Sequence, residues 1–167
     1  MNRIAIIGCG GSGKSTLSRI VSKKKDLPVF YLDTISYKAS WVEQDPAIFK
    51  EKHDEWINQE RWIIDGLMIE TLNKRLEKAD NVVFLDTPHW LCIYRIFKRL
   101  ISDYGKTRED MAEGCKESFD WPFLMYVLGF RKNIRPQVIE ILENNKNNCK
   151  VTIIKTKSEL NKWVETL

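Results

Sequence analysis

The stretch that decides the fold runs from Ile4 to Ser15 and reads IAIIGCGGSGKS. Its second part, Gly8–Ser15, matches the pattern G-x-x-x-x-G-K-[ST] at every position. The four apolar residues before it are typical of a buried parallel strand, and Ser15–Lys25 has the pattern of a helix. In that context, successive backbone N–H groups of the loop can curl around an anion, and the positive end of the helix dipole points at it. The stretch therefore predicts a phosphate-binding loop.

Two side chains of this loop have distinct expected roles. Lys14 would bridge the β- and γ-phosphates of a nucleoside triphosphate, and Ser15 would ligate Mg²⁺. ATP and Mg²⁺ are therefore the expected cofactors, and we interpret Cys9 as a small filler residue. The candidate cofactor-binding residues of the loop are Gly8, Gly10, Gly11, Ser12, Gly13, Lys14, Ser15 and Thr16.

The composition is that of one globular domain. Of the 167 residues, 43% are hydrophobic and 30% are charged, which excludes disorder of the whole chain. The net charge of +4 permits an anionic ligand and does not require nucleic acid. No apolar run could span a membrane, and the first residues lack the pattern of a signal peptide, so we expect a cytoplasmic protein without a membrane partner. The four cysteines and two histidines lack the spacing of a disulfide framework or a zinc site.

Short apolar runs alternate with longer amphipathic stretches along the rest of the chain. Further strands are expected at 28–32, 61–65, 81–86 and 150–154, and helices at 45–60, 70–76, 89–101, 121–145 (broken near Pro136) and 158–166. Strands separated by helices predict an α/β fold, in which a parallel sheet carries helices on both faces. The polar segment 102–119 contains two glycines, and we interpret it as a mobile lid and not as core.

Aspartates end three of the expected strands, at the edge where open α/β sheets bind ligands. Asp33 could accept the proton of an attacking hydroxyl or hold an Mg²⁺-bound water; the alternative is a cap of a loop or helix. Asp65 ends the apolar strand Trp62–Asp65, a pattern typical of a carboxylate that holds Mg²⁺ through water. We assign the metal to Ser15 and Asp65, and Asp86 to a turn.

The middle of the chain resembles a known enzyme group. The run Val82–Pro88, followed by Leu91 and Tyr94–Arg99, resembles the fourth strand and following helix of adenylate-kinase-like phosphotransferases. This resemblance implies that Arg95 packs on the adenine of a bound nucleotide and that Arg99 reaches its phosphates. It also implies a P-loop NTPase fold of three layers, with five parallel strands in the order 2-3-1-4-5.

The chain resembles one bacterial branch more closely, the topology modulation (FlaR-related) proteins. The name of that family comes from an effect on DNA supercoiling, whereas its sequence is that of a small-molecule kinase. The residues that carry this resemblance are Ile6–Cys9, Tyr31–Asp33, Arg61–Gly66, Phe84–Asp86, Pro88, Trp90–Cys92, Arg108, Asp110–Cys115 and Arg135–Pro136. The chain departs from the family at Leu67–Glu70: N-Y-x-x-T is usual after Asp65-Gly66, whereas residues 67–71 read LMIET, which indicates a changed or weakened specificity for the acceptor.

Several arginines follow the fourth strand. Arg95 and Arg99 are four residues apart and share a helix face, Arg108 lies in the expected lid, and Arg131 and Arg135 follow it. Guanidinium groups that close over a γ-phosphate stabilise the charge that develops during its transfer. A solvated basic surface is the alternative for each of them. The catalytic candidates are Lys14, Asp33, Arg99 and Arg108.

The hypothesis is an ATP- and Mg²⁺-dependent phosphotransferase of the nucleoside or nucleotide kinase type. Its partners would be a nucleotide and a small-molecule phosphoryl acceptor, and it would be a monomer or a homodimer. Water would compete for the γ-phosphate while the lid is open, so some ATPase activity is expected. Three aromatic residues flank Asp33, and we interpret them as packing residues, with an acceptor pocket as the alternative: Tyr31, Tyr37 and Trp41.

Two other function classes stay open. The first is a nucleotide-dependent DNA-binding regulator of DNA topology, although no nucleic-acid reader motif supports it. Its phosphate-contacting patch would consist of Lys98, Arg99, Arg131, Lys132 and Arg135. The second is a nucleotide-binding scaffold without turnover, which the departure at Leu67–Glu70 keeps open.

Overall fold

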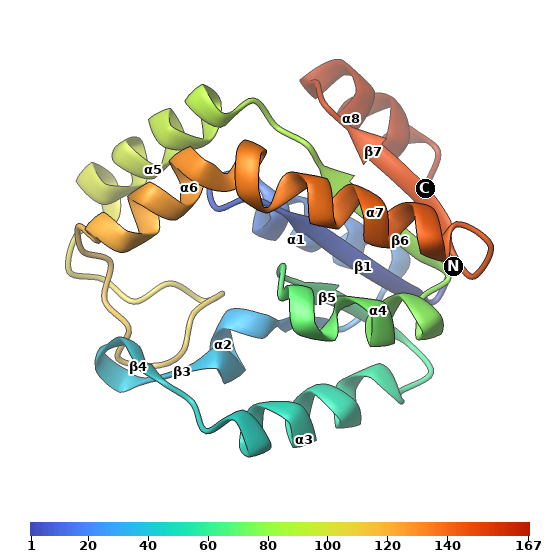
Figure 1. Ribbon diagram of the computed structural model, residues 1–167, viewed down its shortest axis with the longest axis horizontal. Coiled ribbons are helices and arrows are strands. Elements are labelled where there is room, and N and C mark those ends of the chain that lie inside the picture. The colour runs from blue at the N-terminus through green and yellow to red at the C-terminus, as the bar shows by residue number, and fades with distance from the viewer.

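The computed structural model describes residues 1–167, and its centre is a five-stranded parallel sheet (Figure 1). The strands stand in the order β2-β5-β1-β6-β7, which is 2-3-1-4-5 when only the strands of this sheet are counted, so the predicted order is confirmed. Their bounds are Arg3–Gly8 (β1), Val29–Tyr31 (β2), Trp62–Asp65 (β5), Asn81–Leu85 (β6) and Lys150–Ile154 (β7). In this register Asp65 lies beside both Ile6 and Tyr31, and Gly8 lies beside Leu85.

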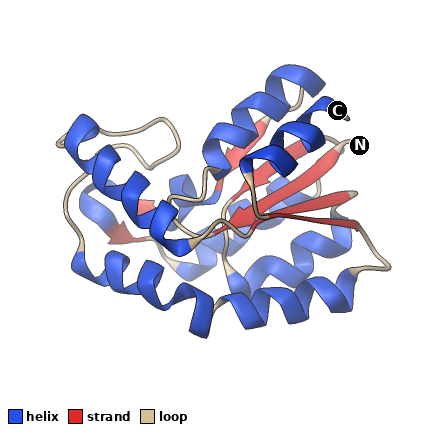
Figure 2. Cartoon of the chain, turned by 90° about the horizontal axis from the view of Figure 1, so that it is seen from above, coloured by secondary structure: helices blue, strands red, loops and turns tan.

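Helices cover both faces of the sheet, as Figure 2 shows. Successive residues of β1 point to opposite faces: Ile4 and Ile6 belong to one core cluster, and Ala5 and Ile7 to another. Against the first face lie α1 (Lys14–Lys25) and α8 (Lys157–Glu165). Against the second lie α3 (Pro46–Ile57), α4 (Ile69–Lys78), α5 (His89–Asp103), α6 (Trp121–Asn133) and α7 (Arg135–Asn145). All five central strands therefore form the middle layer of a three-layer fold.

The region after β2 differs from the predicted one. The expected strand 28–32 ends at Tyr31, and the chain continues directly into the short helix α2 (Leu32–Ser36). Leu32 and Ile35, three residues apart, are both buried, which holds this turn of helix against the core. An antiparallel pair follows, β3 (Tyr37–Lys38) and β4 (Val42–Glu43), separated by the 3-10 turn η1 (Ala39–Trp41). Strands of two residues are too short to show an alternating pattern.

The predicted break in the long C-terminal helical stretch is confirmed. Helix α6 ends at Asn133 and α7 begins at Arg135, with Pro136 in its first turn. Proline lacks the N–H that a continuous helix would need at this position, so a new helix starts there.

The lid, predicted over residues 102–119, spans residues 104–120 because α5 extends to Asp103, and it packs more closely than the sequence indicates. Met111, Ala112 and Cys115 are buried and form a small apolar cluster with Tyr37, so the expectation that this segment holds no core is wrong. Its apolar residues are too few to show a period, which is why the cluster was not foreseen. The Trp41 indole donates to the Lys116 carbonyl at 2.8 Å, which ties the lid to the β3–β4 pair, and the two segments lie side by side in Figure 1.

No helix of the structure is both long and apolar enough to cross a bilayer. All four cysteines are buried and free.

Candidate active site

One large cavity opens where the central strands end at their carboxyl edge. Its volume is about 1300 Å³, whereas a pocket for a single small ligand spans roughly 300–1,000 Å³. It therefore has room for two ligands. The predicted site residues that line it are Gly8, Gly10, Gly11, Gly13, Lys14, Ser15, Thr16, Asp33, Asp65, Arg95, Arg99 and Arg108.

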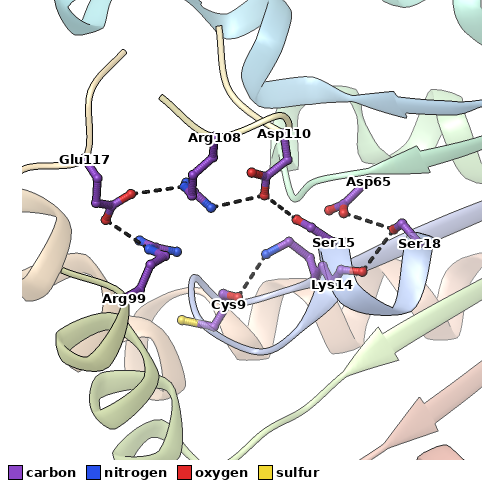
Figure 3. A network of polar contacts seen from close by, with 9 residues as sticks. All are labelled: Cys9, Lys14, Ser15, Ser18, Asp65, Arg99, Arg108, Asp110 and Glu117. Carbon is purple, nitrogen blue, oxygen red and sulfur yellow. Dashed lines mark hydrogen bonds and ion pairs between the residues drawn. The ribbon is translucent and has the colours of Figure 1, made fainter. Parts of the chain in front are cut away.

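The glycine-rich loop between β1 and α1 packs tightly against α5 and α6. Gly11 has φ +74°, and a Cβ there would lie 2.5 Å from the carbonyl oxygen of Cys92 in α5. A Cβ at Gly10 would overlap the ring of Phe123 in α6. The Lys14 ammonium donates to the Cys9 carbonyl at 2.9 Å, which folds its side chain back over the loop (Figure 3). Ser12 is buried, so its side chain lies beneath the loop and outside the cavity.

The residues assigned to the metal lie together at the start of α1. The buried carboxylate of Asp65 accepts a hydrogen bond from the Ser18 hydroxyl at 3.0 Å. Burial raises the pKa of Asp65 to about 6, against the opposing influences of Lys14 and Ser18. The Ser15 hydroxyl points across the cavity and donates to Asp110 of the lid at 2.6 Å.

These oxygen donors fit Mg²⁺. Hydroxyl and carboxylate oxygens are the ligands of this hard cation, which usually keeps waters and substrate phosphates as its remaining ligands. No group of three or more His, Cys, Asp or Glu side chains could hold a metal ion by itself.

A chain of ion pairs connects α5, the lid and the phosphate loop (Figure 3). The Nε of Arg99 donates to Glu117 at 2.9 Å, and the Nε of Arg108 lies 3.0 Å from the other carboxylate oxygen of Glu117. Arg108 also donates to Asp110 at 3.1 Å, and Asp110 accepts from Ser15. Because Glu117 and Asp110 are buried, these pairs are shielded from water.

Sequence reasoning missed the roles of Asp110 and Glu117. Two signals could have found them. Asp110 begins the segment Asp110–Cys115 that carries the family resemblance, and both acids lie within nine residues of Arg108 in a segment with few apolar residues.

Asp33 projects from α2 into the cavity. Confinement there raises the pKa of its carboxyl, and Lys14 is the strongest opposing influence. A carboxylate with a raised pKa that lies close to Lys14 is suited to accept a proton. The short helix α2 supplies this position because its opposite side is anchored by Leu32 and Ile35.

The structure separates the predicted arginines into three groups. Arg99 and Arg108 belong to the ion-pair chain. Arg95 donates to the carbonyl of Ser12 at 2.9 Å and so supports the phosphate loop. Arg131 and Arg135, for which a functional role and a solvated surface were both open, do not line the cavity.

Arg135 binds the buried carboxylate of Asp86. The two side chains make paired hydrogen bonds of 2.9 and 2.7 Å, which neutralise a charge that would otherwise lie unpaired at the end of β6. Asp86 therefore joins β6 to α7, and both of its carboxylate oxygens accept hydrogen bonds from Arg135.

Comparison with known proteins reveals a shared fold at low sequence identity. No protein-family model matches the chain. A uridine kinase of Proteus mirabilis (strain HI4320) is 23% identical over 91 residues, which are 54% of this chain and only 36% of that protein.

Solved structures match over nearly the whole chain. A sugar kinase from Janibacter sp. HTCC2649 superposes with a TM-score of 0.57 at 13% identity and covers 99% of this chain and 91% of its own. Shikimate kinase from Acinetobacter baumannii, in complex with shikimate, gives 0.55 at 17% identity, with 99% and 90% covered. Deoxyadenosine kinase from M. mycoides with bound dATP gives 0.54 at 16% identity, with 98% of each chain covered. The chain thus has the three-layer α/β fold of the P-loop kinases.

Proposed function

We propose that the protein is an ATP- and Mg²⁺-dependent phosphotransferase of the nucleoside or nucleotide kinase type, which phosphorylates a hydroxyl of a small molecule. The observation that carries this proposal is that Lys14, Asp33 and the arginines of the ion-pair chain line one cavity with room for two ligands. A nucleotide would occupy the side of the phosphate loop, and the acceptor the side of Asp33.

Each residue has a role in this mechanism. The backbone amides of the loop and Lys14 would bind the β- and γ-phosphates. Ser15 and Asp65 would hold Mg²⁺, which when bound neutralises charge on the phosphate oxygens. Asp33 would orient the acceptor hydroxyl and take its proton.

The lid side supplies the remaining elements. Arg99 and Arg108 would stabilise the charge on the transferred group, because guanidinium groups in a site with little water act strongly on developing charge. The buried partners Glu117 and Asp110 would hold these arginines in position, and the packed lid would keep water from the γ-phosphate.

The fold and the matched proteins support this class of reaction. The four matched proteins are a uridine kinase, a sugar kinase, a shikimate kinase and a deoxyadenosine kinase. We also propose that the chain belongs with the topology modulation proteins, on the sequence motifs given above. The DNA-binding alternative is weakened, because two of its five basic residues, Arg99 and Arg135, are ion-paired within the protein.

The proposed function is tested by product formation. The protein is incubated with ATP, Mg²⁺ and a panel of nucleosides, nucleotides and sugars, and ADP and phosphorylated acceptor are quantified. Asp33→Asn should lower kcat by roughly 10²–10⁴-fold, because it removes the proton acceptor, and should not weaken ATP binding. Asp26→Asn is the matched control, since Asp26 is an exposed helix cap outside the cavity. Full activity of Asp33→Asn would contradict the assignment.

A further inference from the structure

The positive charges of the cavity are distributed unevenly. Six lysine and arginine side chains line it, and all six come from α1, α5 or the lid: Lys14, Arg19, Arg95, Arg99, Lys106 and Arg108. On the opposite wall, the residues of 31–43 and Gly66–Met68 that line the cavity include no cation, and Lys38 of this stretch is exposed outside the cavity. An anionic acceptor would therefore find no partner on this wall itself, because the cations that act on Asp33 come from the loop and lid side: Lys14, Arg99 and Arg108.

That wall is acidic. Asp33 and Glu43 belong to it, and Asp120 lines the cavity at the start of α6. Burial is the main cause of the raised pKa of the Tyr37 hydroxyl, and the charges of Asp33, Glu43 and Asp120 add to it, which places all three carboxylates in the neighbourhood of this hydroxyl. A second negative charge placed there would be repelled, and because Asp33, Glu43 and Asp120 are themselves exposed to water, solvent weakens this repulsion without reversing its sign.

Aromatic side chains stand on both sides of the same space. Tyr37 and Trp41 meet edge to face, with ring centroids 5.5 Å apart. On α6, the rings of Phe123 and Tyr126 are nearly parallel, with centroids 6.3 Å apart. All four line the cavity, and the charge of Asp33 acts on the Tyr126 hydroxyl as well as on that of Tyr37. A flat ring is the ligand shape that aromatic walls of this kind bind by stacking.

From these three features we infer that the acceptor is an uncharged hydroxyl compound with a planar ring, of the class of nucleosides, and not a nucleoside monophosphate or a carboxylate. This inference rests on the proposed function. In the transfer, the acceptor oxygen forms a bond to the γ-phosphorus, the bond from that phosphorus to the bridging oxygen of ATP breaks, ADP leaves, and the hydroxyl proton passes to Asp33.

Binding measurements separate the two acceptor classes. The protein is saturated with a non-hydrolysable ATP analogue and Mg²⁺, and calorimetry is run with five common nucleosides and their 5′-monophosphates. At least one nucleoside should bind at least about tenfold more tightly than its own monophosphate, a difference of about 1.4 kcal/mol. A monophosphate that binds equally well or better would overturn the inference, as would a failure of all nucleosides to bind to the analogue-loaded protein. Failure of the analogue itself to bind would instead overturn the proposed function.

A charge reversal on the acidic wall provides a second test. Glu43→Arg places a cation where the wall has none, so it should improve the ratio of monophosphate to nucleoside affinity by about fivefold or more. Glu51→Arg is the matched control, because Glu51 is exposed on α3 and outside the cavity. Equal affinity of both variants for the ATP analogue shows that the fold is intact. An unchanged ratio in Glu43→Arg, or the same change in both variants, would overturn the inference.

Discussion

The substitution Gly11→Ala tests whether the contact with α5 sets the shape of the phosphate loop. The φ of Gly11 is +74°, and a left-handed conformation costs an alanine roughly 1–2 kcal/mol. In addition, the new Cβ would lie 2.5 Å from the Cys92 carbonyl oxygen and 3.1 Å from Ile96. The first of these is a backbone atom and cannot turn aside, so overpacking adds a further cost of about 1–3 kcal/mol. We expect a total loss of about 2–5 kcal/mol in the free energy of unfolding.

The same change should weaken nucleotide binding. The loop can relieve the overlap only by moving away from α5, which displaces the amides around the phosphates. We expect ATP affinity, measured by calorimetry, to fall by about tenfold or more.

Gly105→Ala is the matched control. Gly105 has nearly the same φ, +75°, but nothing lies within 4 Å of its Cβ position. It should therefore lose only the conformational cost, about 1–2 kcal/mol in urea unfolding, and retain its ATP affinity. If both variants lose the same stability and bind ATP equally well, the reasoning about the close approach of α5 is refuted.

Three further predictions follow from the buried ionisable groups. The pKa of Asp65 is about 6, and Mg²⁺ would be held by its ionised carboxylate, so the Mg²⁺-dependent affinity for nucleotide should fall as the pH drops through 6. In calorimetry, Asp65→Asn should flatten this pH dependence, and equal pH profiles of the wild type and the variant would contradict the metal role. Glu117→Gln leaves Arg99 and Arg108 without their shared anion, so urea unfolding should show a loss of about 1–3 kcal/mol, and an unchanged midpoint would count against the ion-pair chain. Burial lowers the pKa of His53 from 6.5 to about 4, so as the pH falls His53 binds a proton in the unfolded chain before it does so in the folded protein. The free energy of unfolding of the wild type should therefore drop by about 2 kcal/mol more than that of His53→Leu between pH 7 and 4.5. Identical pH dependences of the two proteins would refute this.

The sheet could be predicted because short continuous runs of the sequence identify its strands. Ile4–Ile7 and Val82–Leu85 are continuously apolar, a pattern typical of strands that are buried on both faces. The loop motif at Gly8–Ser15 identifies the run just before it as the strand that leads into the phosphate loop. The β3–β4 pair could not be predicted, since two-residue strands carry no period and the residues that pack on them come from the lid, far along the chain.

The candidate site was only partly predictable for a different reason. Lys14 is identified by the phosphate-loop motif, and Asp33 and Asp65 by their positions at the carboxyl ends of strands, the edge where such sheets bind ligands. The partners that hold the site together are distant in sequence: Asp110 is 95 residues from Ser15, and Asp86 is 49 from Arg135. Acidic residues in a polar segment carry the same pattern whether they are solvated or buried, so their pairing depends on the tertiary structure.

ATP binding by the Lys14→Ala variant is the decisive measurement of whether the loop at Gly8–Ser15 binds a triphosphate. Loss of a charge-assisted contact to phosphate costs about 1.5–3 kcal/mol, so calorimetry should show ATP affinity reduced by about ten- to a hundredfold. Lys132→Ala, on an exposed residue of α6 outside the cavity, should bind ATP like the wild type. Unchanged ATP affinity in Lys14→Ala would show that Lys14 does not bind the phosphates of ATP.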